Sequence, residues 1–416
     1  MKIHVHRSLS DVMPELTYIL NLLAKNKRIT FEQVPAADLS TPSIGTEGSD
    51  CTIEISPAFV NRNLLASKLN SDGFFELQNG KPDFISTAFF CVTAMQEFND
   101  HDHDRLQRFQ YKNSYQSVIG NIKKNVVQIC FDKVTETLKI KATPIASTFF
   151  LSHDIDTIQG ALVEDGFNVA KKGRVDLLLK LIFRAATGRP DWFNIDKILK
   201  IESEYDCRST FFWIVNGGRV GKDENADYTF RSPRIQKSMS SVTAHGSENG
   251  LHKSLSDESV VQEVEKYGTL PLANRYHYLK FNLPQGFEAV EEAGIKLDAS
   301  LGFSEQMGFR NNYGLPFNPF NFKNRRPFSF VEAPLHIMDR TFFHKRLALS
   351  QIEKEIFAFF EDHRENCVLS VLWHNNFFSE YKYKGYLPLY KKILAYIREN
   401  SKTITQTEII EKYNII

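Results

Sequence analysis

Apolar and polar residues follow one another in the first third of the chain in a pattern that predicts a small α/β unit. The apolar runs are short enough for strands, and they are separated by segments with the 3.6-residue period of an amphipathic helix. The predicted strands are 3–6, 29–34, 126–131 and 137–141, and the predicted helices are 9–25 and 84–98. A stretch containing Pro144 follows. We place a domain boundary there, with an N-terminal α/β accessory domain at 1–145.

The remaining part of the chain, 146–416, alternates strand-like and helix-like segments. The predicted strands include 147–151, 209–215, 250–252 and 368–373, and the predicted helices are 175–186, 195–204, 256–267, 287–293, 351–363 and 386–397. Alternation of this kind over roughly 270 residues is typical of a barrel-like α/β domain. The sequence therefore predicts an α/β fold in two parts, the second of them a (β/α) barrel.

Composition narrows the classes of partner. Lys and Arg number 51 against 50 Asp and Glu, so the formal net charge is +1 and no strong field attracts nucleic acid or an anionic membrane. No uncharged run approaches the ~18 residues that a membrane span needs. The first 23 residues contain one short apolar segment, broken by Glu15, and no cleavage pattern of a signal peptide. We expect a soluble cytoplasmic protein that acts on a small neutral or polar substrate, with no nucleic acid partner and no membrane span.

Two acids one residue apart, Asp154 and Asp156, come directly after the apolar run 147–151. Side chains at i and i+2 share a face of a strand, so both carboxylates can point into one pocket. One could bind a metal while the other takes a proton. The alternative is a strand-end turn in which an Asp caps the next segment.

Four further polar positions lie at strand-like or turn segments. They are His252 after Gly250-Leu251, Arg275 before Tyr276-His277-Tyr278, Asp298 with Ser300, and His374 after Leu372-Trp373.

In this order and at these separations, the residues resemble the motifs of the polysaccharide deacetylase family, the NodB-like metal-dependent enzymes of carbohydrate esterase family four. The resemblance covers about 148–416. It implies a distorted (β/α) barrel, commonly of seven strands, that removes acetyl groups from sugars. The stretches 301–310, 315–317 and 334–339 resemble a bacterial subgroup in particular. In that subgroup an uncharacterised α/β domain, similar to residues 1–145, precedes the barrel.

The resemblance also implies catalytic roles. Asp154 would be the general base, Arg275 would keep it ionised and aimed, and His374 would be the general acid. Asp298 would help to build the pocket and tune His374. The residues with an implied substrate contact are Ser300 and Trp373.

The implied cofactor is a divalent metal ion, for which zinc is our expectation, bound by Asp156 and His252. In the family, a second His follows the first by four residues, and this chain has Ser256 there. Ser256, His277 and His245 are therefore the candidates for a third ligand. Ser256 is also a suitable N-cap for the predicted helix at 256–267, and we favour that interpretation of it.

These observations predict a metal-dependent hydrolase that removes an acetyl group, preferably N-acetyl, from a sugar or polysaccharide precursor. A nucleotide-linked or lipid-linked intermediate is the form of precursor that we favour. The alternative is a catalytically impaired deacetylase-like protein that binds glycan or acts as a scaffold. Ser256, at the position of an expected metal ligand, is the residue that keeps this alternative open.

Overall fold

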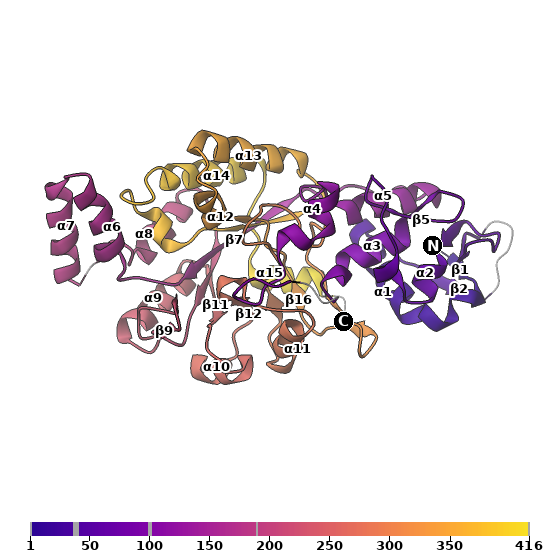
Figure 1. Cartoon of the computed structure of the whole chain (residues 1–416), viewed down its shortest axis with the longest axis horizontal. Helices are drawn as coiled ribbons and strands as arrows, with labels where there is room; N and C mark the ends of the chain where they lie inside the picture. The colour runs from indigo at the N-terminus through magenta and orange to yellow at the C-terminus, as the bar shows by residue number, and fades with distance from the viewer. Residues whose placement is uncertain (1, 36–40, 99–101, 189, 415–416) are drawn as a thin grey trace.

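The computed structural model of the chain describes residues 2–35, 41–98, 102–188 and 190–414. Near the N-terminus, four short parallel strands form a sheet in the order β2-β1-β3-β4. They are β1 Lys2–Val5, β2 Glu32–Val34, β3 Ser43–Thr46 and β4 Ile53–Ile55. The accompanying helices are α1 Met13–Lys27, α2 Pro57–Val60, α3 Phe84–Val92, α4 Tyr115–Ile119 and α5 Val126–Thr137. Figure 1 shows these elements together at one end of the molecule.

The two strands predicted at 126–131 and 137–141 are wrong, because residues 126–137 form helix α5 and residues 138–141 form a turn and irregular chain. The β-branched Val126 and Val127 suggested a strand, but the buried positions Val126, Cys130 and Val134 recur every four residues, which is the helical period. Asn125 starts the helix by accepting a hydrogen bond from the backbone N–H of Gln128.

The larger sheet has eight parallel strands in the order β16-β13-β12-β11-β8-β7-β18-β17. They are β7 Thr148–Ile155, β8 Ser209–Trp213, β11 Glu248–Lys253, β12 Ala273–Tyr276, β13 Leu297–Asp298, β16 Val331–Glu332, β17 Ile337–Met338 and β18 Val368–Leu372. The edge strands β16 and β17 belong to one segment, 331–338, so four residues join the two edges of the curled sheet. The expected α/β fold with a barrel-like parallel sheet is confirmed, and its eight strands come from seven segments of the chain.

Ten α-helices belong to the described residues of this part of the chain, and Figure 1 shows most of them around the sheet, with the first two projecting from one end. They are α6 Ala161–Lys171, α7 Val175–Ala186, α8 Ile195–Ser203, α9 Pro233–Ala244, α10 Val260–Tyr267, α11 Gln285–Glu292, α12 Asp339–His344, α13 Leu349–Asp362, α14 Tyr386–Asn400 and α15 Gln406–Tyr413. Three short antiparallel pairs complete the strands: β5 Phe75–Glu76 with β6 Pro82–Asp83, β9 Arg219–Val220 with β10 Asp223–Glu224, and β14 Phe320–Asn321 with β15 Arg326–Pro327. Among the described residues, no helix combines the length and the apolar character needed to cross a bilayer.

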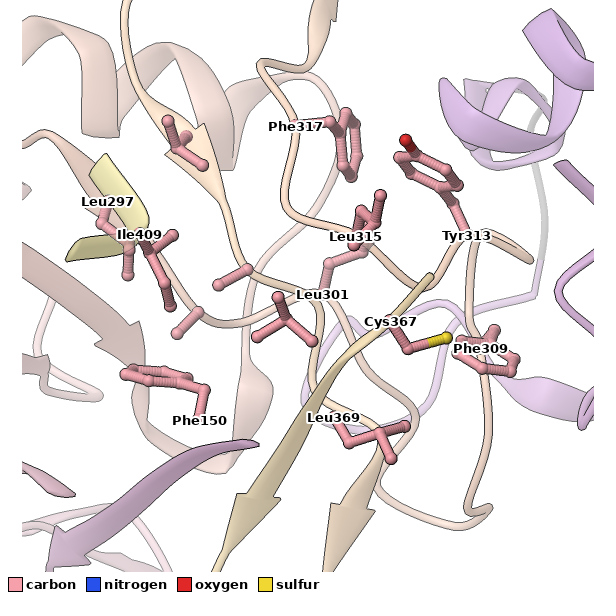
Figure 2. Packing of buried hydrophobic residues seen from close by; sticks show 14 of the residues in the cluster. Phe150, Leu297, Leu301, Phe309, Tyr313, Leu315, Phe317, Cys367, Leu369 and Ile409 are labelled. Carbon is pink, nitrogen blue, oxygen red and sulfur yellow. The ribbon is translucent and has the colours of Figure 1, made fainter. Parts of the chain in front are cut away.

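The main hydrophobic cluster runs from the N-terminal helices into the larger sheet. Figure 2 shows part of it, where Phe150 of β7 and Leu297 of β13 lie in the same cluster as Ile409 of α15. Tyr313 extends the cluster toward the N-terminal elements, with its ring 6.2 Å from that of Phe131. The division of the chain into domains at 145/146 stays a prediction, because apolar packing continues across this position.

Candidate active site

The carboxyl ends of parallel strands meet at one edge of a sheet. The acids and imidazoles identified in the sequence lie at this edge. Asp154 lies on β7, His252 on β11 and Arg275 on β12. Asp156 directly follows β7, and His374 is the second residue after β18. All five side chains are almost completely buried. A cavity of about 400 Å³ opens at this edge. Its lining includes Asp154, Asp156, His277, Arg340 and His374.

Asp156, His252 and His277 form a buried group that could hold a metal ion. Asp156 Oδ1 lies 3.3 Å from Nε2 of His252 and 3.4 Å from Nδ1 of His277. The two imidazole nitrogens are themselves 3.1 Å apart. Three ligand atoms of the types that zinc prefers therefore face a common point.

The outer nitrogen of each imidazole identifies the tautomer. Nδ1 of His252 is 2.8 Å from the carbonyl oxygen of Arg275, and Nε2 of His277 is 2.8 Å from that of Glu224. Carbonyl oxygens only accept, so both outer nitrogens carry hydrogen, and in the neutral form of each ring the inner nitrogen has a lone pair available for a cation. Asp156 Oδ1 is buried without a hydrogen-bond donor. These three acceptor atoms fit a divalent cation.

The pKa values of the two imidazoles shift in opposite directions. Burial lowers the pKa of His277 to about 4, which keeps this imidazole in the neutral form that binds metals. Burial opposes ionisation of His252 as well, but the carboxylates of Asp154 and Asp156 raise its pKa above the ordinary value. Negative charge from the two acids therefore outweighs the cost of burying a cation here.

Asp154 is held in the ionised form. Its Oδ1 lies 3.0 Å from Nη1 of Arg275, which is fully buried. Arg275 is fixed in turn by hydrogen bonds to the carbonyl oxygen of Ala299 and the hydroxyl of Ser152, each 2.8 Å long. Burial would raise the pKa of Asp154, but His252 and Arg275 together lower it below the usual value. A carboxylate in this state can accept a proton at neutral pH.

His374 is oriented by Asp339, a residue to which the sequence assigned no role. Asp339 Oδ1 is 2.7 Å from Nδ1 of His374, and Oδ2 accepts the backbone N–H of His374 at 2.6 Å. The other ring nitrogen, Nε2, lies 3.8 Å from Asp156 Oδ2. Asp339 begins α12 directly after β17, within a stretch that the family resemblance included. Its position after a strand end was the signal that could have identified it.

Asp298 contacts Asn274 and Ser300 and has no direct bond to His374 among the described residues, so its expected tuning role stays a prediction. Its carboxylate accepts hydrogen bonds from Asn274 Nδ2 at 2.7 Å and from Ser300 Oγ at 3.1 Å. Ser300 also accepts the backbone N–H of Tyr276. Burial raises the pKa of Asp298. The pKa of Glu332 is raised well above its usual range by burial and by the charge of the neighbouring Asp298. Asp298 and Ser300 thus connect the ends of β12 and β13, and neither residue lines the cavity.

Trp373 was expected to contact substrate, and the structure places it elsewhere. It is fully buried, with ring centroids 5.9 Å from Tyr386 and 5.5 Å from Tyr390 of α14. Successive side chains of an extended segment point to opposite sides, so Trp373 enters the core while His374 faces the cavity. Its role is packing between β18 and α14.

The other two candidates for a third ligand, Ser256 and His245, make contacts outside the group of Asp156, His252 and His277. Ser256 Oγ bonds to Ser254 Oγ at 2.9 Å and to Glu263 at 3.1 Å, away from Asp156. The expected N-cap role of Ser256 is also wrong, because α10 begins at Val260 and is capped by Ser259. His245 is exposed at the end of α9, where its ring bonds to the carbonyl oxygen of Ser241. His277 is therefore the candidate that lies where a third ligand is needed.

Arginines complete the cavity. Arg340 Nη2 lies 3.2 Å from Asp156 Oδ2. Arg105, Leu106 and Arg108 also line the cavity, although they precede β7 by some 40 residues in the sequence. Arg108 Nη1 donates a 2.6 Å hydrogen bond to the carbonyl oxygen of Tyr278, a residue with a left-handed backbone at φ 58°. This bond supports the strained turn that carries His277.

Comparison with known proteins adds the following similarities. Residues 8–143 match the model of a family of unknown function (DUF7033). No curated protein sequence matches the chain significantly. Among solved structures, a proposed polysaccharide deacetylase from Mycobacterium smegmatis is similar with a TM-score of 0.41 and 14% identity over 65% of this chain and 92% of that one. The 4-alpha-glucanotransferase of Thermococcus litoralis is similar with a TM-score of 0.38 and 12% identity over 65% of this chain and 40% of that one.

Proposed function

We propose that the protein is a metal-dependent hydrolase that removes an acetyl group, preferably N-acetyl, from a sugar or polysaccharide precursor. The observation that carries this proposal is the convergence of Asp156, His252 and His277 beside an ionised Asp154 and an oriented His374. Hydrolysis of an amide needs a base, stabilisation of charge on the carbonyl oxygen, and a proton for the leaving nitrogen. The cavity brings side chains for each of these tasks to one place. The acetylated sugar as substrate comes from the motif resemblance.

Asp156, His252 and His277 would hold a divalent ion, zinc in our proposal, which supplies Lewis acidity for the acetyl carbonyl and for water. Asp154 accepts the proton of the attacking water, and its contact with Arg275 keeps it ionised for this step. His374 donates a proton to the leaving group through Nε2, because Nδ1 is engaged by Asp339. The cavity volume of about 400 Å³ lies within the usual range for small-molecule sites.

The alternative of an impaired glycan-binding or scaffold protein rested on Ser256 at the expected position of a ligand. The place of His277, 3.4 Å from the Asp156 carboxylate, supports an active enzyme over this alternative. His277 reaches the same point from the turn after β12, so a His four residues after His252 is not required.

The test combines metal content with turnover. Zinc is measured by elemental analysis, and acetate release is measured on N-acetylglucosamine oligomers for the wild type, Asp154→Asn and the surface control Asp362→Asn. We expect bound zinc in all three proteins, and a loss of roughly 10²–10⁴-fold in turnover for Asp154→Asn alone. Turnover that survives Asp154→Asn would reject the base assignment. A protein that binds no zinc and releases no acetate would favour the glycan-binding alternative.

A further inference from the structure

Helices α6 and α7 form a hairpin that projects from one end of the molecule, opposite the N-terminal elements (Figure 1). Its inner side is packed, with Val169 and Leu181 buried and Leu178 against Gly166. Its outer side exposes large apolar side chains. The exposed fractions are 75% for Val163, 70% for Phe167, 63% for Val175, 62% for Leu179, 68% for Phe183, 45% for Ile182 and 38% for Leu162.

This apolar surface is local to the hairpin. Within the described residues, seven of the fourteen exposed large apolar side chains lie between 161 and 186. On α7 the exposed positions Val175, Leu179, Ile182 and Phe183 follow the spacing i, i+4, i+7, i+8, which places them in one outward stripe. The other side of α7, which includes the buried Leu181, packs against α6. An apolar stripe on each side of a helix indicates that the outer one has a partner as well.

The charges around this surface identify the kind of partner. Lys171 and Lys172 lie at the turn between the helices, and Lys180 borders the stripe next to Leu179. Among the described residues, these three lysines form no ion pair. The acids nearby are engaged: Asp176 pairs with Arg174, Glu164 with Lys382, and Asp165 accepts hydrogen bonds from Trp192 and Ser379. Unpaired positive charge around exposed Phe and Leu side chains complements an anionic lipid surface.

We propose that the outer face of the α6–α7 hairpin binds the surface of an anionic bilayer. With 11 and 12 residues, the helices are each about 18 Å long or less. The hydrocarbon core of a bilayer is about 30 Å thick, so the helices lie in the headgroup region and do not cross it. The net charge of the whole chain, +1, does not indicate this basic surface, because acidic residues elsewhere in the chain balance the lysines of the hairpin. The proposal stands independently of the reaction at the cavity.

Binding is tested with the full chain by sedimentation with vesicles. We expect the wild type to sediment with vesicles of phosphatidylcholine and phosphatidylglycerol, to bind pure phosphatidylcholine more weakly, and to dissociate as salt is raised. Removing two exposed rings in Phe167→Ser/Phe183→Ser should weaken binding by about tenfold or more. The matched control Val118→Ser/Leu270→Ser, which removes exposed apolar groups elsewhere, should bind as the wild type does. Lys171→Glu/Lys172→Glu should lose the preference for anionic vesicles, and Lys237→Glu should keep it.

Two outcomes would overturn the proposal. One is a wild type that fails to sediment with the anionic vesicles, or a Phe167→Ser/Phe183→Ser variant that sediments equally well. The other is a wild-type dimer, seen by light scattering, that the same two substitutions convert to a monomer without any vesicle binding by the wild type. In that case a second copy of the chain covers the hairpin.

Discussion

Asp339 uses both of its carboxylate oxygens on His374, one for the ring Nδ1 at 2.7 Å and the other for the backbone N–H at 2.6 Å. The first contact selects the tautomer, and the second fixes the main chain from which the ring projects. Together they direct Nε2 toward the cavity. If His374 is the general acid, as we propose, a ring held in this way loses little freedom when it transfers a proton.

Asp339→Asn should therefore impair the reaction without emptying the metal site. An amide has one oxygen, so it must turn its NH₂ group toward one of the two donors of His374. We expect turnover to fall by about 100-fold or more, with the zinc content unchanged. The measurement is acetate release together with elemental analysis.

The double variant Asp339→Asn/His374→Ala is the control for this interpretation. Because Asp339 acts through His374, the double variant should be no slower than His374→Ala alone. Additive losses would show that Asp339 acts on the reaction by another route.

His277→Ala should abolish tight metal binding, whereas Ser256→Ala should leave it intact. The first change removes one of three ligand atoms, and the second affects only a hydrogen-bond network with Ser254 and Glu263. We expect zinc affinity to fall by roughly 100-fold or more for His277→Ala, since even outer partners of a site contribute 10–100-fold. Competition with a chromophoric chelator measures both affinities. Equal affinities for the two variants would reject His277 as a ligand.

Arg108→Ala should weaken zinc binding from a distance. Arg108 holds the carbonyl oxygen of Tyr278, and release of this left-handed residue lets the adjacent His277 move. A loss of about tenfold in zinc affinity is expected. Arg105→Ala is the matched control, because Arg105 lines the same wall but pairs with Asp223. A similar loss in both variants would mean that the charge of the wall matters and the turn does not.

Glu332→Gln should change how stability depends on pH. Burial and the neighbouring Asp298 raise the pKa of Glu332 well above 4.5 in the folded chain, while in the unfolded chain the group ionises near its ordinary value. Its protonated form therefore favours folding, and this contribution is complete below the unfolded pKa and lost as the pH rises through the folded pKa. Relative to the wild type, Glu332→Gln should gain stability as the pH rises above about 4.5. Midpoints of urea unfolding at acid and neutral pH measure this trend, and the exposed Glu265→Gln should show none.

The sequence predicted much of the candidate site, because several of its residues sit at the carboxyl ends of strands. Asp154, Asp156 and His252 follow or end apolar runs, so periodicity and order in the chain sufficed to group them. His277 was an open alternative, since its position depends on a left-handed turn that no pattern of apolar residues indicates. Asp339 follows a short strand that could have drawn attention to it, but its partner His374 could not be predicted, because their contact arises from the pairing of β17 with β18.

In the fold, long periodic helices such as α7 and α14 were predicted well, and short segments were not. Residues 126–137 carry β-branched side chains in a helix, because burial against α3 outweighs their local preference for strands. Trp373 was misplaced for a related reason. A residue beside a predicted acid looks functional in the sequence, while strand geometry turns neighbouring side chains to opposite faces.

The segment 331–338 pairs with β13 at one end and with β18 at the other, and the next residue is Asp339. The same eight consecutive residues therefore influence both the curvature of the whole sheet and the orientation of the His374 imidazole. An insertion that lengthens this segment, or a substitution that loosens it, should change both the curvature of the sheet and the orientation of the His374 ring. We therefore expect most loops of the barrel to tolerate insertions better than this segment does.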